Sequence, residues 1–281
     1  MTPDTGGEDA APETESDVVP AGAARALHNL LDGPGSPPAG GDPLPPLWHW
    51  LAFLPRTSQR DLGPDGHPRP GSSTQPEDFP RRMFAGSRLW FPGKARIDRK
   101  LLRQSDVVST TEKAGRSGPL LFVTIGHRIA DEGEVVVREE QDIVYRPSEQ
   151  HGTARREGPV PPTGDWTWGL DLHPTETMLF RFSALTYNAH RIHYDRTYAE
   201  EIEGYPGLVV QGPLQAIALA EVCRRYCPDR PMTSFVFRAL RPAFEGGILR
   251  FRGRPNRSTV DLAVFDGSDR RTMEATATLE P

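Results

Sequence analysis

GPLQAIALAEVCRRYC, residues 212–227, is typical of a helix that is apolar on nearly every side. Gly212 precedes Pro213, and proline suits the first helical position because its missing N–H would have no partner there. The residues that follow are apolar through three turns, namely Leu214, Ala216, Ile217, Ala218, Leu219, Ala220 and Val222. A helix that is apolar all round is a buried helix. We therefore expect other elements to enclose residues 212–227.

Four segments after this helix are expected to be the strands that enclose it. They are SFVFRALRPAF (234–244), GILRFRGRP (247–255), TVDLAVFD (259–266) and RRTMEATATLE (270–280). The connections are short, which indicates an antiparallel meander. TMLFRFSALT (177–186) is expected to be a further strand before the helix. An antiparallel sheet wrapped around a buried helix is the hot-dog fold, of class α+β.

The first half of the chain is expected to repeat this order. AARALHNLLD (23–32) indicates a short amphipathic helix, and strands are expected at 87–93, 101–115, 119–131 and 134–146. Residues 147–165 are rich in Pro, Gly and charge, as inter-domain linkers are. The sequence thus predicts a double hot dog, two antiparallel sheets each wrapping a central helix, with halves at 22–146 and 166–281.

Composition limits the location and partners of the protein. A net charge of -5 over 281 residues gives no general reason to expect a nucleic acid or an anionic membrane as partner. Residues 1–21 are acidic and small, so we expect a disordered tail rather than a secretory signal. Cys223 and Cys227 lie four apart on a helix, a spacing that usually prevents a disulfide. We expect a cytoplasmic protein, and a homodimer is possible.

YNAHRIHYD (187–195) places two histidines and an asparagine within six positions of one another. One interpretation is that these histidines are packed residues bonded to the backbone. Another is a metal site, but a catalytic zinc needs a third protein ligand and none lies at a recognisable spacing, so no metal is expected. Asp195 could orient an imidazole or simply belong to a turn. No glycine-rich phosphate loop is present in the sequence.

FRFSALTYNAHRIHYDRTYAEEIEGYPGLVVQGPLQA (180–216) resembles the active-site segment of the MaoC-like, R-specific enoyl-thioester hydratases. It is closer still to their type 2 3-hydroxyacyl-thioester dehydratase branch, which includes mesaconyl-CoA and itaconyl-CoA hydratases. PLPPLWHWLAFLP (43–55), RRMFAGSRLWF (81–91) and EEQDIVYR (139–146) extend the resemblance to the first half. The resemblance implies a hydro-lyase with a catalytic C-terminal half. Its substrate would be an acyl-CoA thioester, with no cofactor besides.

The wider hydratase family carries an Asp-x-Asn-Pro-x-His pattern, in which the aspartate and the histidine handle water and proton. The final histidine falls on His193. Asn188, His190 and Arg191 stand where the pattern has aspartate, asparagine and proline. The branch that this chain resembles shares the departure, but it removes the usual carboxylate. The division of labour among these residues is therefore open.

Roles can still be assigned from chemistry. His193 can exchange protons near neutral pH, and the Asn188 amide can hold a water by donating and accepting hydrogen bonds. His190 is either a second proton-transfer group or the residue that fixes the tautomer of His193. Gly212 offers a free N–H at the positive end of the helix to a thioester oxygen, although a simple glycine cap predicts the same residue. The flanking residues expected to contact substrate are Tyr187, Gln211 and Pro213.

Aromatic and basic residues of the first half are further candidates. Trp48 and Trp50 could line an acyl or pantetheine tunnel, or pack in the core of that half. Arg82, with Arg81 and Arg88, could bind a coenzyme A phosphate or an acidic acyl group, or be ordinary solvated arginines. Two other functions stay open, a hot-dog thioesterase and a non-catalytic acyl-binding subunit.

Overall fold

The computed structural model describes residues 13–71, 77–115, 118–147 and 165–281. Its helices are α1 (Ala21–Leu30), α2 (Glu176–Thr186) and α3 (Gly212–Tyr226), with short helical turns η1 (Trp48–Leu51), η2 (Gln59–Asp61), η3 (Arg191–His193) and η4 (Tyr198–Ile202). The strands are β1 (Glu13–Val18), β2 (Arg81–Trp90), β3 (Lys100–Gly115), β4 (Gly118–Asp131), β5 (Glu134–Arg146), β6 (Trp168–Leu172), β7 (Met232–Ala239), β8 (Leu249–Asn256), β9 (Thr259–Phe265) and β10 (Arg271–Leu279). No helix of these residues is long and apolar enough to span a bilayer.

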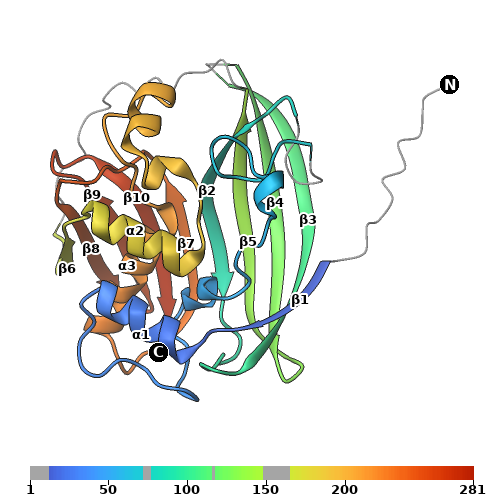
Figure 1. Ribbon diagram of the computed structural model, residues 1–281. Coiled ribbons are helices and arrows are strands. Elements are labelled where there is room, and N and C mark those ends of the chain that lie inside the picture. Colours follow the sequence, from blue (N-terminus) through green and yellow to red (C-terminus); the bar gives the residue numbers. More distant parts are fainter. Residues whose placement is uncertain (1–12, 72–76, 116–117, 148–164) are drawn as a thin grey trace.

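All ten strands join one antiparallel sheet in the order β1-β3-β4-β5-β2-β7-β10-β9-β8-β6 (Figure 1). The order reads alike from both edges, because β2 and β7 are the inner strands of two five-stranded halves. They pair along a seam that runs from Gly86 opposite Arg238 to Trp90 opposite Ser234. The double hot dog is thus built on one continuous sheet, whereas two separate sheets were expected.

The C-terminal half matches the expected hot dog. Helix α3 packs against all five of its strands, β6 to β10. Its apolar residues from Leu214 to Cys223 are buried, as the uninterrupted apolar sequence predicts. Both cysteines are free, as their spacing predicts. The four strands after α3, β7 to β10, form within about five residues of their predicted bounds, whereas β6 was not predicted.

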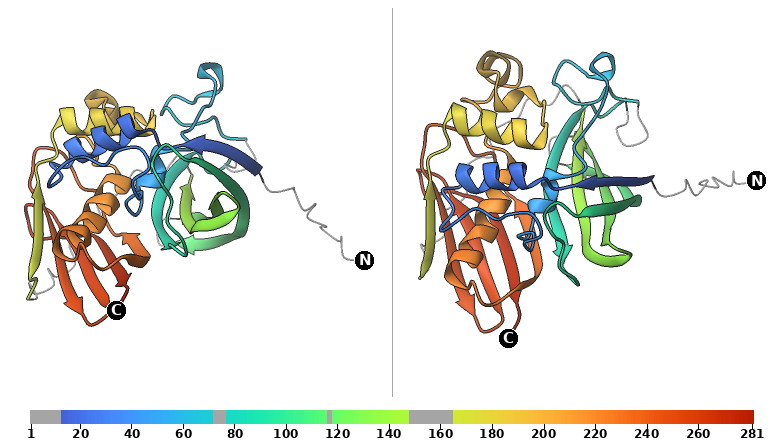
Figure 2. Two further views of the ribbon diagram at one scale, coloured as in Figure 1. Left: turned by 90° about the horizontal axis from the view of Figure 1, so that it is seen from below. Right: turned by 60° about the horizontal axis from the view of Figure 1, so that its bottom comes forward.

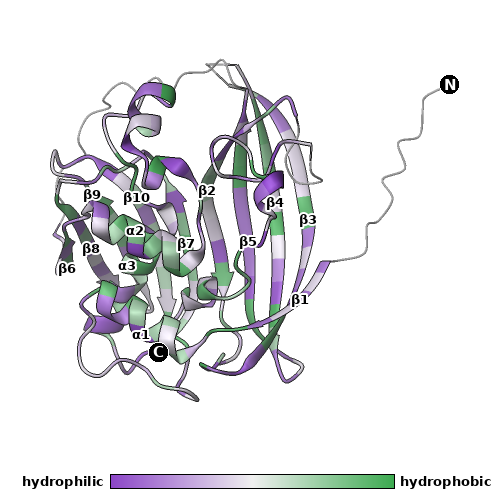
Figure 3. Ribbon diagram, viewed as in Figure 1, coloured by the Kyte–Doolittle hydropathy of each residue, from purple (hydrophilic) through white to green (hydrophobic). Residues whose placement is uncertain are grey.

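The N-terminal half has the expected strands but no central helix among its described residues. Helix α1 forms as predicted, yet it packs against α2 and η1 instead of entering the curl of β3, β4 and β5 (Figure 2). The expectation that each sheet wraps a helix is therefore wrong for this half. Hydrophobic residues gather in β4 and β5 of this half, whereas β3 is largely hydrophilic and exposed (Figure 3).

A buried polar cluster lies on the inner face of the N-terminal half. The Glu139 carboxylate accepts hydrogen bonds from Trp50 Nε1 at 3.1 Å, Ser87 Oγ at 3.0 Å and Gln141 Nε2 at 3.0 Å, and contacts His49 Nε2 at 3.1 Å. Burial alone would raise the pKa of Glu139, but the His49 bond and its neighbours lower it to about 2. A buried charge needs such partners. They occupy the face that an apolar helix would otherwise cover.

Two further expectations are wrong. Residues 177–186 were expected to be a strand but lie in α2, because the Thr175 side chain caps the Met178 N–H at 3.2 Å. Helical spacing then buries Leu179 and Phe182 on one side. The expected disordered tail contains β1, which pairs with β3, while residues 1–12 lie outside the described part. The linker expected at 147–165 also falls outside it, except for its first and last residues.

Candidate active site

His193 is held by the backbone in one tautomer. It lies in η3 with only 7% of its surface exposed, and its Nδ1 is 2.7 Å from the carbonyl oxygen of Val209. A carbonyl can only accept, so Nδ1 carries the proton and Nε2 is left with a lone pair. Burial lowers the pKa of His193 to about 4, although the Val209 bond opposes the change. At neutral pH the ring is therefore a neutral base.

Val209, not His190, thus fixes the tautomer of His193, which corrects one of the two roles considered for His190. The Val209 N–H also donates to the Ile192 carbonyl at 2.9 Å. These two bonds fasten the segment before α3 to the turn that carries His193. The base and the helix start are therefore parts of one connected structure.

Gly212 opens α3, where its N–H has no backbone acceptor among the described residues. A Cβ added there would meet nothing closer than Phe84 Cδ1 at 3.8 Å, and the backbone is not in the left-handed region. The fold itself therefore does not require glycine at this position. Approach of a ligand oxygen to a free N–H at a helix start does account for it.

Asn188 and His190 lie in the turn between α2 and η3. Asn188 Oδ1 accepts the His190 backbone N–H at 3.0 Å. The oxygen keeps a second lone pair and the NH₂ keeps its two donors, so the amide can still donate to and accept from a water. Burial lowers the pKa of His190 well below 6.5, and the charges of His67, His193 and Arg82 lower it further. Its ring centroid lies 5.3 Å from that of His193.

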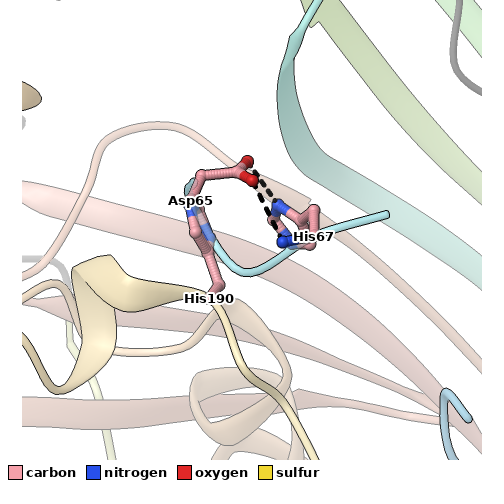
Figure 4. Close-up of side chains that lie close together, drawn as sticks. All are labelled: Asp65, His67 and His190. Atoms are coloured by element: carbon pink, nitrogen blue, oxygen red, sulfur yellow. Dashed lines mark hydrogen bonds and ion pairs between the residues drawn. The ribbon is translucent and has the colours of Figure 1, made fainter. Parts of the chain in front are cut away.

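A loop of the N-terminal half brings Asp65 and His67 to His190 (Figure 4). The His67 and His190 ring centroids are 4.1 Å apart, and Asp65 Oδ2 lies 3.1 Å from His67 Nδ1. The loop is fastened by Arg191, whose N–H donates to the Asp65 carbonyl and whose Nη1 donates to Pro64, both at 2.9 Å. Two halves of the chain therefore build one polar centre.

Gly66 permits this approach. Its φ is +88°, and a Cβ would lie 1.9 Å from the carbonyl oxygen of Ala189. Only glycine tolerates both conditions. The loop passes so close to the turn at 188–190 that a side chain at position 66 would push the loop and the turn apart.

The sequence interpretation missed Asp65 and His67, which it left in a polar loop. The available signal was PDGHP (64–68), a turn sequence that carries an acid and an imidazole two positions apart. Asp65, His67 and His190 offer one carboxylate oxygen and two ring nitrogens within 4.8 Å of one another. In the described part of the chain this is the group that could hold a metal ion. Asp195 pairs with Arg191 at 2.6 Å and so does not orient an imidazole.

The sequence matches the hydroxyacyl-thioester dehydratase type 2 family over residues 47–245. The chain belongs to this family. It is 43% identical to mesaconyl-C(4)-CoA hydratase from Chloroflexus aurantiacus over 267 residues, which cover 95% of this chain and 94% of the relative. This dehydratase is therefore a hydro-lyase, which forms or breaks a carbon–oxygen bond in an acyl thioester.

Solved structures show the same fold. A MaoC-like dehydratase from Phytophthora capsici aligns with a TM-score of 0.68 at 10% identity, covering 97% of this chain and 96% of that one. A Mycobacterium tuberculosis protein described as having a double hot-dog fold aligns with a TM-score of 0.58 at 14% identity, covering 96% of each. At these identities the likeness concerns the fold alone.

The expected substrate contacts of the dehydratase divide into two groups. Tyr187 ends α2 in the left-handed conformation and is 63% exposed, so it does not line the buried centre. Gln211 is fully buried and donates to the Leu179 carbonyl and Ser183 Oγ, which makes it a link between α2 and α3. Pro213 is half-buried beside Gly212 and remains a candidate contact.

The aromatic and basic candidates of the first half divide in the same way. Trp48 is buried in the main core and does not line a tunnel. Trp50 is half-buried and packs edge-on against Phe84, the side chain nearest to Gly212. Arg88 is bound by Asp142 at 2.6 Å and by Glu140 at 2.9 Å, so its charge is compensated. Arg81 pairs with Glu203 at 3.5 Å.

Arg82 differs from Arg81 and Arg88 in its surroundings. It is half-buried, and within the described residues no acidic side chain pairs with it. Arg82 and Phe84 lie two residues apart on β2 and face the buried Tyr145 and Ile143 of β5, so they point to the same inner face. Its charge reaches His190 and lowers the pKa of that ring. Arg82 is therefore a cation beside the polar centre that has no acidic partner in the described part of the chain.

Proposed function

We propose that the protein reversibly hydrates a 2-enoyl-CoA whose acyl group carries a second carboxylate, of the mesaconyl type. The observation that carries the proposal is the connection between His193 and Gly212. One short segment, 209–212, fixes the tautomer of the base and then presents the free N–H. Hydration of a conjugated thioester needs these two functions together, a base for water and a donor for the thioester oxygen.

The proposed hydration begins with a water held between the Asn188 NH₂ and His193 Nε2. His193 takes a proton from the water as its oxygen attacks the β-carbon. Negative charge moves to the thioester oxygen, where the Gly212 N–H and the positive end of α3 stabilise it. A proton then reaches the α-carbon and completes the 3-hydroxyacyl thioester. Dehydration is the reverse sequence.

Arg82 supports the dicarboxylic acyl group. A carboxylate on the substrate would supply the negative charge that no described side chain offers to this arginine, and guanidinium–carboxylate pairs are strong and directional. The 43% identical relative is named for mesaconyl-C(4)-CoA, an acyl group with a second carboxylate. Both observations favour a small acidic acyl group over a long apolar chain.

The remaining parts of the proposal concern the surroundings of the reaction. Coenzyme A is the carrier of the substrate, and we assign no cofactor to the chemistry. The net charge of -5 and the two free cysteines support a cytoplasmic location. Self-association as a homodimer is tested by light scattering on the purified chain.

The experiment is an absorbance assay of the conjugated thioester with mesaconyl-CoA and crotonyl-CoA, with a parallel assay for free thiol. Loss of the conjugated absorbance without free thiol is expected, and it should be faster with mesaconyl-CoA. Free thiol would identify a thioesterase. Unchanged absorbance and thiol with both substrates would contradict the proposed reaction and favour a non-catalytic acyl-binding role.

A further inference from the structure

The C-terminal half holds a base but no carboxylate for the reaction. Asn188 stands where the wider pattern has aspartate, and Asp195 is bound to Arg191. Hydration nevertheless requires a second proton transfer, because the α-carbon gains a proton while the water loses one. His190 lies beside His193, but no carboxylate among the described residues of the C-terminal half bonds to it, so a group on another element is a further candidate for this proton.

The N-terminal loop supplies a carboxylate and an imidazole at this place. Asp65 Oδ1 accepts the His67 backbone N–H at 3.0 Å, while Oδ2 lies 3.1 Å from His67 Nδ1. Both carboxylate oxygens are therefore engaged with the same residue, which fixes the ring and leaves its Nε2 as the available nitrogen. The His67 side chain is 16% exposed, so it is partly accessible without being free to swing.

We propose that His67, oriented by Asp65, is the catalytic acid that delivers the proton to the α-carbon. The N-terminal half would then supply the proton donor that the C-terminal half lacks. The inference rests on the proposed hydratase function. His67 would touch the substrate and is a catalytic residue, whereas Asp65 acts through His67 and is a positioning residue.

The charges of the cluster agree with this assignment. Three imidazoles lie together, and their mutual repulsion disfavours more than one positive charge among them. Asp65 contacts only His67 of the three, so a positive charge is best compensated there. Burial lowers the pKa of His190 and of His193, and the neighbouring His67 lowers both further, so these two rings stay neutral. The acid and the base of the reaction are thereby separated onto different rings.

The proton balance closes without another reactant. Water loses a proton to His193 Nε2 and forms the carbon–oxygen bond at the β-carbon. His67 gives the proton on Nε2 to the α-carbon as the carbon–carbon double bond becomes single. The proton now on His193 returns to His67 through His190, whose ring contacts both others at centroid distances of 4.1 Å and 5.3 Å. The product is the substrate plus one water.

A metal ion at Asp65, His67 and His190 is the competing use of the same atoms. An ion bound through His67 Nδ1 would displace the contact of that nitrogen with Asp65 Oδ2, whereas one bound through Nε2 would leave it in place. The observed bonds already satisfy both groups, which favours the hydrogen-bonded pair. The experiment therefore includes a test for an ion.

The test compares His67→Gln and Asp65→Asn with two matched controls, His173→Gln at an exposed histidine and Asp61→Asn at an exposed acid of the same loop. With mesaconyl-CoA, His67→Gln should lower kcat about a hundredfold with little change in KM, because only proton delivery is lost. Asp65→Asn keeps an oxygen for the His67 N–H but removes the charge that holds the ring. It should therefore lower kcat about tenfold with little change in KM, and thermal unfolding shows whether each variant folds.

The outcomes separate this inference from the hydratase function. No hydration by the wild type would overturn both. Hydration by the wild type that persists in His67→Gln at more than about half the rate would overturn this inference alone. A folded Asp65→Asn whose kcat equals that of Asp61→Asn would also overturn it. Loss of wild-type activity with a chelator, restored by Zn²⁺ or Mn²⁺, would replace the acid with a metal ion.

Discussion

The two halves of the sheet have the same strand order but differ in what precedes the inner strand. In the C-terminal half, α3 comes immediately before β7 and fills the concave face. In the N-terminal half the corresponding place, before β2, holds η2 and the loop with Asp65 and His67, and no α-helix occurs among its described residues. Because no helix fills this place, the segment with Asp65 and His67 extends to the other half.

The interiors differ accordingly. Helix α3 gives the C-terminal half a mostly apolar centre, in which the buried Glu221 pairs with Arg224 and Arg225. The N-terminal half contains an ionised Glu139 that is held by His49, Trp50, Ser87 and Gln141. A polar interior costs desolvation and is stable only when every group has a partner. In the mechanism proposed above, one half serves as the scaffold for the base, and the other would supply the acid and the specificity.

The largest effect is expected from His193→Ala, which tests the C-terminal half as the source of the base. Without Nε2, no described group is tied to the helix start and able to take a proton from water. We expect kcat to fall about a thousandfold or more. Steady-state kinetics with mesaconyl-CoA measure it, and thermal unfolding confirms the fold. Wild-type turnover in this variant would place the base elsewhere, and His173→Ala is the control.

Gly212→Ala tests the helix start. The new methyl finds room beside Phe84 but occupies the approach to the N–H, so the fold should persist while kcat falls about a hundredfold. Gly22→Ala is a matched control, because it lies in the first turn of α1 with nothing within 4 Å. If both variants kept full activity, Gly212 would be only a helix-end residue.

The comparison also shows what the sequence could predict. α3 and the strands of both meanders are encoded in local periodicity, which residues 212–227 and 119–146 display without ambiguity. Residues 177–186 satisfy both a strand and a helix pattern, and capping by Thr175 with burial against the core decides for the helix. Strand β1 was not predicted because its sequence is polar. It pairs only with β3 and buries little surface.

The residues of the candidate site also differ in how far the sequence predicts them. His193 and Gly212 follow from one continuous motif, and the resemblance located them. Asp65 and His67 belong to a loop whose position depends on Gly66, on Arg191 and on the absence of a helix at this place. PDGHP (64–68) indicates the turn, but its contact with His190 joins distant segments and could not be predicted from the sequence alone.

Gly66→Ala tests whether the N-terminal loop must reach the catalytic turn. The Cβ would collide with the Ala189 carbonyl and push Asp65 and His67 away from His190. We expect kcat to fall about thirtyfold, less than for loss of the base, because proton delivery becomes inefficient but is not abolished. Gly133→Ala is the control, with a φ of +90° and nothing within 4 Å, so it carries the same backbone strain without the collision. Equal activities of Gly66→Ala and Gly133→Ala would mean that the loop takes no part in catalysis.

Arg82→Gln tests the specificity assigned to the N-terminal half. Loss of a guanidinium–carboxylate pair should raise KM for mesaconyl-CoA about tenfold and leave crotonyl-CoA unaffected. The exposed Arg138→Gln removes the same charge from the surface and should change neither. An equal rise for both thioesters would assign Arg82 to coenzyme A instead of the acyl group.

The smallest effect concerns the acid side of the pH profile, and it compares His193 with an ordinary histidine. Because burial lowers its pKa to about 4, His193 should remain mostly unprotonated at pH 5, where kcat/KM should keep about nine-tenths of its neutral value. An acid limb of the kcat/KM profile near pH 6.5 would mean that water reaches the His193 ring in the free enzyme.

The same pKa affects stability. In the unfolded chain His193 binds a proton already below about pH 6.5, whereas in the folded chain it does so only near pH 4. Stability should therefore fall as the pH drops through this window, and urea unfolding at pH 7 and pH 5 should show that loss reduced in His193→Ala.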